Sequence, residues 1–169
     1  MLLSEILHER VIKLEVRAQD KSTAMEELVD VLIEAGDIPM VLRAHVIEAL
    51  EEREKSVSTG MGNGLALPHC ATDRVDSVTG ALGISRHGID FVCRDGSPAN
   101  ILILLVIPRR SFQEHLHTVS SIARVMRQKT LREAILAARD AKTILHLIET
   151  EETKDGLSAA PKKGSTGPR

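Results

Sequence analysis

The alternation of apolar and polar residues divides the chain into helical segments towards both ends and strand-like segments in the middle. Residues 2–7 have the pattern of a short helix, and residues 22–35 have that of a longer helix with one apolar stripe. Gly36 directly after this stripe is a typical helix stop, and Ser22 or Thr23 is the expected N-cap. The first part of the chain is therefore predicted to be largely helical.

Further helices are predicted on both sides of the middle region. One follows the proline at position 39 and covers residues 39–54, because proline suits the first helical turn. Another covers residues 111–127, and its apolar residues lie on one face at helical spacing: Phe112, Leu116, Val119, Ala123 and Met126. Two shorter helices are expected at residues 131–138 and 141–149, the second capped by Asp140.

Four apolar stretches predict β-strands. Residues 11–16 alternate between apolar and polar side chains, residues 65–67 form a short apolar run before Pro68, and residues 79–85 form another strand. Residues 101–107 are apolar throughout, so this strand is expected to be central and buried on both faces. Strands that mix with helices in this way predict the α/β class.

The length of 169 residues suits one folded domain. We place this domain at residues 1–150 and expect residues 151–169 to be a disordered tail, because the end of the chain is rich in Gly, Pro, Ser and Lys. The longest apolar run, residues 101–107, is too short to span a membrane, which argues against membrane insertion.

Charge and aromatic content exclude some functions. The chain has 22 Lys and Arg against 24 Asp and Glu, so it lacks the basic surface that nucleic acid requires. Two Phe residues, without Trp or Tyr, leave little material for base stacking. Cys70 and Cys93 do not make a disulfide scaffold and are compatible with a reducing cytoplasm, where we expect the protein to work.

The strongest candidate for chemistry is a glycine-rich segment that leads into a histidine. Residues 58–64 read Ser-Thr-Gly-Met-Gly-Asn-Gly, and after a short apolar run Pro68 precedes His69. The candidate anion-binding positions are Ser58, Thr59, Gly60, Gly62 and Gly64. Backbone N–H groups of such a loop can approach an anion closely, and a rigidly held imidazole can accept a phosphoryl group. The pattern alone slightly favours the alternative of a glycine-rich turn before an ordinary surface histidine, because glycine-rich loops are common.

Helical positions indicate two further candidates, His115 and Arg53. His115 falls on the edge of the apolar stripe of residues 111–127, whereas His117 falls on the opposite side. Arg53 lies on the apolar side of its helix, where a positive charge requires an anionic partner. The alternative is that Arg53 stabilises the C-terminus of the helix as a cation.

Metal binding is disfavoured by the same geometry. His69, Cys70, His115 and His117 are ligand types, but two histidines two residues apart on a helix diverge and cannot hold one ion together. We therefore expect no metal and no cofactor. Cys70 is expected to be a packing residue.

Three segments in this order resemble the EIIA domain of the fructose/mannitol type in the bacterial phosphoenolpyruvate-dependent phosphotransferase system. They are Arg53-Glu54-Lys55, residues 58–69, and Glu114-His115-Leu116-His117-Thr118. The resemblance covers about residues 3–148. The chain is most similar to the stand-alone nitrogen-regulatory branch, although a free-standing sugar-system EIIA could look similar.

The resemblance implies a fold, a reaction and partners. The fold would be a mixed sheet of about five strands between helices, as in mannitol-type EIIA. His69 would be phosphorylated on Nε2 by an HPr-like or NPr-like phosphocarrier protein, with Arg53 and His115 beside the phosphoryl group. A sugar-system EIIA would pass the group to an EIIB cysteine, whereas a nitrogen-type protein would control the binding of regulated target proteins. A non-catalytic regulatory binding protein is the third alternative.

Docking of a phosphocarrier predicts an exposed apolar patch near His69, for which Met61, Leu65 and Leu67 are the candidates. The family usually has a small residue after the phosphorylated histidine, so Cys70 is a departure that leaves the local packing open.

Overall fold

The computed structural model describes residues 1–156, so the predicted tail from residue 157 onward lies outside the described residues. The α/β class is confirmed, with a six-stranded mixed sheet where about five strands were expected. The strand order is β1-β5-β6-β3-β2, and β4 also pairs with β6. The bounds are β1 Ile12–Lys13, β2 Gly60–Gly62, β3 Leu65–Ala66, β4 His69–Thr72, β5 Thr79–Ile89 and β6 Ala99–Pro108.

Strand β6 is the centre of the sheet, as its continuous apolar sequence predicted. It pairs antiparallel with β5 and parallel with both β3 and β4. Its side chains from Ile101 to Ile107 are at most 1% exposed. Both faces are covered, so the run carries no polar alternation.

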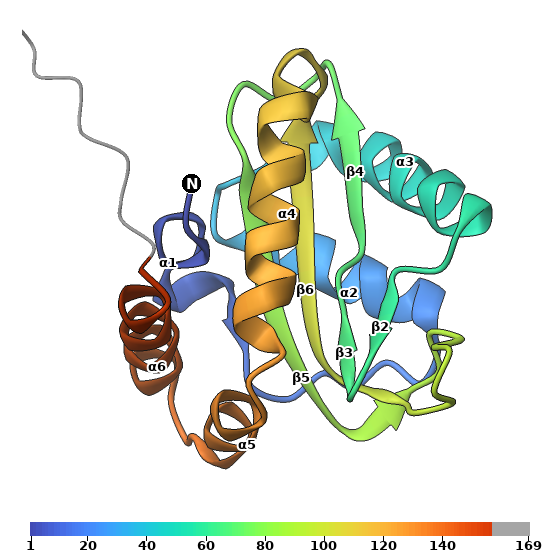
Figure 1. Cartoon of the computed structure of the whole chain (residues 1–169). Coiled ribbons are helices and arrows are strands. Elements are labelled where there is room, and N and C mark those ends of the chain that lie inside the picture. Colours follow the sequence, from blue (N-terminus) through green and yellow to red (C-terminus); the bar gives the residue numbers. More distant parts are fainter. Residues whose placement is uncertain (157–169) are drawn as a thin grey trace, which may run out of the picture.

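Helices cover both faces of this sheet (Figure 1). Helices α2 (Lys21–Glu34) and α3 (Arg43–Ser56) lie on one face, and α4 (Phe112–Met126) lies on the other. Helices α1 (Leu3–Ile6), α5 (Lys129–Ala137) and α6 (Ala141–Lys154) pack together at the side. Short 3₁₀ turns link these elements, at Glu9–Val11, Met40–Leu42 and Arg109–Ser111. No helix among residues 1–156 is long and apolar enough to cross a membrane.

Several predicted element ends differ from the structure. Asp20, rather than Ser22 or Thr23, caps α2, because its carboxylate accepts the Thr23 N–H at 2.9 Å. Pro39 precedes a 3₁₀ turn, and the α-helix proper starts at Arg43. The predicted strand at residues 11–16 pairs over only two residues. Gly36 ends α2 with a φ of +80°, and Asp140 caps α6, as predicted.

Helix α6 extends beyond the predicted end of the folded domain. It continues to Lys154, so the placement of the tail at residues 151–169 is wrong for its first residues. The reason is Glu152, which is 3% exposed. Its carboxylate accepts the backbone N–H groups of Leu3 (2.8 Å) and Ser4 (3.0 Å), so it caps the N-terminus of α1.

His69 lies in β4, which continues the path of β3 alongside β6 after an interruption at residues 67–68. Strand β3 pairs Leu65 with Ile101, and β4 pairs His69 with Leu105, so both keep the same register against β6. Pro68 lies at the interruption, and it has no N–H to donate to the ladder. Its carbonyl still accepts the Leu105 N–H at 3.0 Å.

The glycine-rich segment, predicted to be a loop, is a β-hairpin in the structure. Strands β2 and β3 pair antiparallel around Asn63 and Gly64, whose φ values are +56° and +79°. Two consecutive positive φ angles are typical of the type I′ turn that joins two strands tightly. The Asn-Gly dipeptide is the sequence signal that would have identified this hairpin.

Candidate functional site

His69 begins β4 and is largely buried, with 9% of its surface exposed. Its ring Nδ1 lies 2.8 Å from the carbonyl oxygen of Leu67. A carbonyl oxygen accepts but cannot donate, so the neutral ring must carry its proton on Nδ1. Nε2 is then left with a free lone pair, as a nucleophile requires.

The surroundings of His69 keep its ring neutral. Burial is the main cause that lowers the pKa of His69, and the positive charge of Arg53 lowers it further. The hydrogen bond to the Leu67 carbonyl and the negative charge of Glu54 act in the opposite direction, but they do not reverse the shift. The imidazole is therefore uncharged near neutral pH.

Arg53 lies in the last turn of α3, where its charge reaches His69. The guanidinium Nη1 donates a hydrogen bond of 2.9 Å to the carbonyl oxygen of Val57, just beyond the end of the helix. This hydrogen bond fits the interpretation of Arg53 as a cation at a helix end, and its role beside an anionic group stays a prediction. The side chain satisfies backbone at the helix end and also acts on the charge of His69.

The sequence indicates no separate role for Glu54, which belongs to the Arg53-Glu54-Lys55 motif. It is 6% exposed, although it is a carboxylate next to Arg53. Its Oε1 accepts the backbone N–H of Thr59 (3.0 Å) and lies 3.3 Å from Lys21 Nζ, and its Oε2 accepts the Thr59 hydroxyl (2.5 Å). Helical periodicity places it near the apolar side, but its partners come from the tertiary structure.

The amide groups of the glycine-rich hairpin are largely engaged within the protein. The N–H of Thr59 donates to Glu54, that of Gly60 to the Ser58 hydroxyl (3.1 Å), and that of Gly64 to the Ser97 hydroxyl (3.4 Å). The Ser58 hydroxyl in turn donates to the carbonyl oxygen of Phe91. These contacts hold the hairpin in place, and they leave those three amides committed to acceptors in the protein.

Gly60 has a second reason to be glycine. A Cβ at this position would lie 2.5 Å from Cys93 Sγ and 3.0 Å from the Phe91 carbonyl oxygen. The hairpin therefore packs closely against residues 91–93. Gly62 has a φ of +79°, a left-handed conformation that glycine adopts without strain.

The two histidines of α4 differ in burial, in the direction that the helical wheel predicted. His115 is half-buried, and its Nδ1 is buried with no hydrogen-bond partner among residues 1–156. His117 is exposed. Burial lowers the pKa of His115. No hydrogen bond within the described part of the chain joins His115 to His69.

The buried face of α4 is rotated towards His115 relative to the predicted stripe. Leu116, predicted to face the core, is 39% exposed. Ala123 and Met126 are buried as predicted, and the other buried positions are Thr118, Ile122 and Val125. This rotation moves His115 from the edge of the stripe towards the packed side of the helix.

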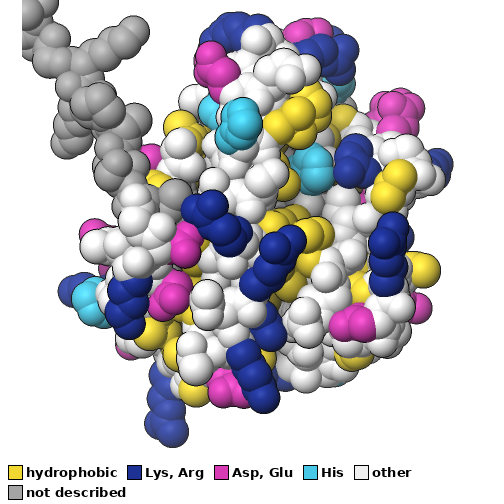
Figure 2. Space-filling view, in the orientation of Figure 1, with side chains coloured by type: hydrophobic (Ala, Val, Ile, Leu, Met, Phe, Trp, Pro, Cys, Tyr) yellow, Lys and Arg dark blue, Asp and Glu magenta, His cyan; other side chains and the backbone are white. Residues whose placement is uncertain are grey.

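The predicted apolar patch has a different composition in the structure. Leu65 and Leu67 are 3% and 2% exposed, because they face the core from the strand edge, so their assignment to a docking patch is wrong. Met61 is 45% exposed, as expected. Figure 2 shows hydrophobic side chains in a hollow beside α4, with Lys and Arg side chains around it.

Among residues 1–156 there is no group of three His, Cys, Asp or Glu side chains that could hold a metal ion. Cys70 and Cys93 are free and buried. Burial raises the pKa of Cys70 to about 12, so its thiol is protonated and poorly reactive.

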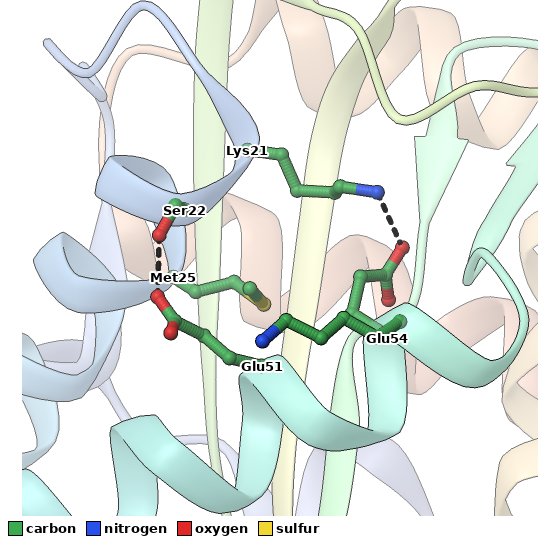
Figure 3. A pocket seen from close by; sticks show the side chains of 6 residues that line it. Lys21, Ser22, Met25, Glu51 and Glu54 are labelled. Carbon is green, nitrogen blue, oxygen red and sulfur yellow. Dashed lines mark hydrogen bonds and ion pairs between the residues drawn. The ribbon is translucent and has the colours of Figure 1, made fainter.

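A cavity of about 220 Å³ lies between α2 and α3, and Glu54 is one of the residues that line it (Figure 3). Lys21 and Glu54 approach each other across it, and the Ser22 hydroxyl donates a hydrogen bond of 2.5 Å to Glu51. The cavity contains both signs of charge and does not reach His69.

Comparison with known families finds a match over nearly the whole described chain. A model of the family described as "Phosphoenolpyruvate-dependent sugar phosphotransferase system, EIIA 2" matches residues 5–151. The fructose-specific EIIA component of Haloferax volcanii is 34% identical over 142 residues, which are 84% of this chain and 91% of that protein. The nitrogen regulatory protein of Escherichia coli K12 is 31% identical over 157 residues, covering 90% of this chain and 93% of that protein.

A solved structure agrees with these relatives. The nitrogen regulatory protein IIA-Ntr of Neisseria meningitidis superimposes with a TM-score of 0.79 and 31% sequence identity. The match covers 86% of this chain and 98% of that one.

Proposed function

This chain belongs to the EIIA 2 family of the phosphoenolpyruvate-dependent sugar phosphotransferase system, and we propose that Nε2 of His69 is its phosphoryl acceptor. Proteins of this family are phosphotransferase relay proteins. The observation that carries the assignment is the hydrogen bond from Nδ1–H to the Leu67 carbonyl, because it leaves the Nε2 lone pair available on a neutral ring.

The transfer exchanges one phosphorus–nitrogen bond for another. The Nε2 lone pair attacks the phosphorus of a phosphohistidine whose other ring nitrogen carries a proton. The electron pair of the breaking bond returns to the donor ring, which leaves as a neutral imidazole, and the positive charge passes to the phosphorylated His69 ring. His69 keeps its proton on Nδ1 throughout, with the Leu67 carbonyl as its acceptor. Such a transfer needs positioning and charge stabilisation more than covalent help.

Arg53 and His115 have different parts in this proposal. Arg53 supplies a permanent positive charge for the oxygens of the transferred group. His115 has a lowered pKa, so it acts near neutral pH as a neutral ring that donates one N–H. Ser58, Thr59, Gly60, Gly62 and Gly64 act by holding the hairpin beside the site, since the amides of Thr59, Gly60 and Gly64 already have acceptors.

The partners follow from the family. EIIA proteins of this system exchange phosphoryl groups with a phosphocarrier and with EIIB domains. For this chain we propose an HPr-like or NPr-like phosphocarrier as the donor, acting in the cytoplasm, where the free thiols of Cys70 and Cys93 would stay reduced.

Two downstream roles are supported by different relatives. Similarity to nitrogen regulatory proteins in sequence and in structure favours a regulatory role, in which phosphorylation of His69 changes the binding of target proteins. The 34% identity to a fructose-specific EIIA component favours transfer to an EIIB cysteine. We place the regulatory role first, and a chase of labelled protein with fructose-type and mannitol-type EIIB domains separates the two.

The test of the acceptor is phosphorylation in a defined mixture. The full chain is incubated with phosphoenolpyruvate, Enzyme I and each candidate phosphocarrier, and its intact mass is measured. We expect the gain of one phosphoryl group, labile in acid and stable in base, and no gain for His69→Ala. Uptake of label by a folded His69→Ala variant would overturn the assignment.

A further inference from the structure

A line of hydrogen bonds leads from the ion pair of Lys21 and Glu54 to the ring of His69. Glu54 accepts both the N–H and the hydroxyl of Thr59, at 3.0 Å and 2.5 Å. The Thr59 carbonyl oxygen accepts the N–H of Leu67 at 3.1 Å. The Leu67 carbonyl oxygen then accepts Nδ1–H of His69 at 2.8 Å. Each link joins neighbouring segments of the site, and the first member, Lys21, comes from α2.

The interruption between β3 and β4 makes these hydrogen bonds important for the direction of the Leu67 carbonyl. In a regular ladder, the N–H of residue 68 would bond to the neighbouring strand, but Pro68 has no N–H. The orientation of the peptide unit between Leu67 and Pro68 therefore depends on the backbone hydrogen bonds of the two flanking groups, the Leu67 N–H and the Pro68 carbonyl. One support is the Leu67 N–H on Thr59, and the other is the Pro68 carbonyl on the Leu105 N–H.

Glu54 holds Thr59, whose carbonyl oxygen accepts the Leu67 N–H. Its carboxylate is 6% exposed, and burial of a charge is costly unless partners satisfy it. The partners are Lys21 Nζ at 3.3 Å and the two donors of Thr59. Lys21 Nζ also lies 5.8 Å from the centroid of the Phe91 ring, and the Phe91 carbonyl oxygen accepts the Ser58 hydroxyl. Figure 3 shows Lys21 pointing across the cavity towards Glu54.

We propose that Glu54 is a positioning residue for phosphoryl transfer, which acts through Thr59 and Leu67 to hold the His69 ring with Nε2 presented to the donor. The inference rests on His69 being the acceptor, as proposed above. Among the described residues, no hydrogen bond joins Glu54 to the His69 ring, although its negative charge acts on the pKa of that ring. Its effect is on the tautomer and on the orientation of the imidazole.

The test compares variants that weaken the line at single links. Thr59→Val removes the hydroxyl link and keeps the size of the side chain, while Thr59→Ser keeps the hydroxyl. Glu54→Gln keeps the length of the side chain and removes the charge. The tautomer of His69 is read from nitrogen chemical shifts in the full chain with labelled histidine. Transfer is measured in a single turnover with a phosphorylated phosphocarrier.

We expect Thr59→Val and Glu54→Gln to raise the fraction of His69 that carries its proton on Nε2. The single-turnover rate should fall about tenfold. This loss is smaller than the roughly hundredfold loss that a misplacement of about 1 Å causes, because one link of several is weakened. The concentration of phosphocarrier at half-maximal rate should change little, because the docking surface is not altered. Thr59→Ser should restore most of the rate.

Glu152→Gln is the matched control, because Glu152 is also a buried carboxylate that accepts two backbone N–H groups but belongs to α6. It should lower the melting temperature and leave the His69 tautomer and the transfer rate of the folded protein unchanged. If Thr59→Val and Glu54→Gln behave in the same way, Glu54 has only a structural role and the inference is wrong.

The two proposals fail in different ways. A wild-type chain that takes no phosphoryl group from any carrier would contradict the proposed function, and the tautomer measurement would still decide whether Glu54 orients the ring. If Glu54→Gln does not fold, the comparison of Thr59→Val with Thr59→Ser decides the question alone.

Discussion

At the scale of single residues, the proposed site combines one permanent cation, Arg53, with two imidazoles, His69 and His115, whose pKa values burial lowers. Arg53 carries its charge at every relevant pH, whereas the pKa values of His69 and His115 are both lowered. In this proposal, Arg53 would supply positive charge to the anionic phosphoryl group, and His69 would remain an uncharged nucleophile. The three side chains therefore contribute in different ways, and single substitutions can separate their contributions.

Substitution of Arg53 should affect transfer more than stability. Arg53→Ala removes a charge-assisted contact to the phosphoryl group, which costs roughly 2–4 kcal/mol in the transition state. In the resting fold it removes one hydrogen bond, to the Val57 carbonyl, worth about 1 kcal/mol. Single-turnover rates and thermal melting measure the two effects. A folded variant with the wild-type rate would leave Arg53 only its role at the helix end.

The two histidines of α4 provide an internally controlled comparison. His115→Ala should slow transfer, because it removes the N–H donor on the half-buried side of the helix. It should also shift the titration of His69, since two imidazoles in one site are coupled. His117→Ala changes an exposed side chain and should cost less than about 0.5 kcal/mol of stability and no transfer rate. An equal defect in both variants would contradict the orientation of α4 in the site.

The lowered pKa values make the stability of the fold depend on pH. Between their native pKa values and the ordinary value of 6.5, His69 and His115 bind more protons in the unfolded chain than in the folded one. The free energy of unfolding should therefore rise as pH increases through this window and fall as pH decreases below 6.5. Asp20, Asp95 and Asp140, whose pKa values lie below 3.8, act only at lower pH.

Urea denaturation at intervals from pH 7.5 to pH 5 measures this dependence. The slope below pH 6.5 should be smaller in His69→Gln, which has no titrating ring at this position. A wild-type slope of zero across the window would show that the two rings titrate normally in the folded state.

At the scale of elements, the β2–β3 hairpin determines the surroundings of His69. It is tied to α3 through Glu54 and to residues 91–93 through Gly60 and the Ser58 hydroxyl. The segment that the sequence identifies as a source of free amides is thus a support for the site. Its rigidity comes from contacts with parts of the chain that lie up to 33 residues away.

Two glycine substitutions distinguish packing from backbone conformation. In Gly60→Ala the new Cβ would collide with Cys93 Sγ and the Phe91 carbonyl, which should cost about 1–3 kcal/mol of stability. Because the collision moves the hairpin next to Thr59, the transfer rate should fall as well. Gly36→Ala meets no atom within 4 Å but requires a φ of +80°, which costs about 1–2 kcal/mol without any change in transfer. Denaturation midpoints and single-turnover rates of the two variants test this difference.

At the scale of the whole molecule, Glu152 joins the two ends of the described chain. Its carboxylate caps α1 from a distance of 149 residues in sequence, so α1 and α6 are stabilised together. This contact lies apart from the β2–β3 hairpin and from His69. Stability and chemistry therefore depend on two buried glutamates that belong to different parts of the fold.

Glu152→Gln should destabilise the fold by about 1–3 kcal/mol, because one of the two amide donors of α1 loses its acceptor. Hydrogen exchange of the Leu3 and Ser4 amides should become faster. Glu5→Gln is the control on the same short helix, since Glu5 is exposed and accepts, among residues 1–156, only the Leu2 N–H. It should cost less than about 0.5 kcal/mol. Equal losses in the two variants would contradict the capping role of Glu152.

Periodicity along the chain was sufficient for features that depend on local geometry. The apolar run at 101–107 predicted a central strand because only a strand with two covered faces needs no polar residue. The spacing within α4 placed His115 and His117 on different sides for the same kind of reason. The order of Arg53, the glycine-rich segment and His69 was enough to indicate the family and the candidate acceptor.

Only the tertiary structure decided how these parts meet. It committed three hairpin amides to acceptors in the protein, buried Leu65 and Leu67, rotated α4 so that Leu116 faces outward, and extended α6 to Lys154. It also buried Glu54 in line with His69. The physical reason is that a hydrogen bond or a burial depends on which distant segment arrives alongside, whereas a periodic pattern reports only which face of an element is apolar.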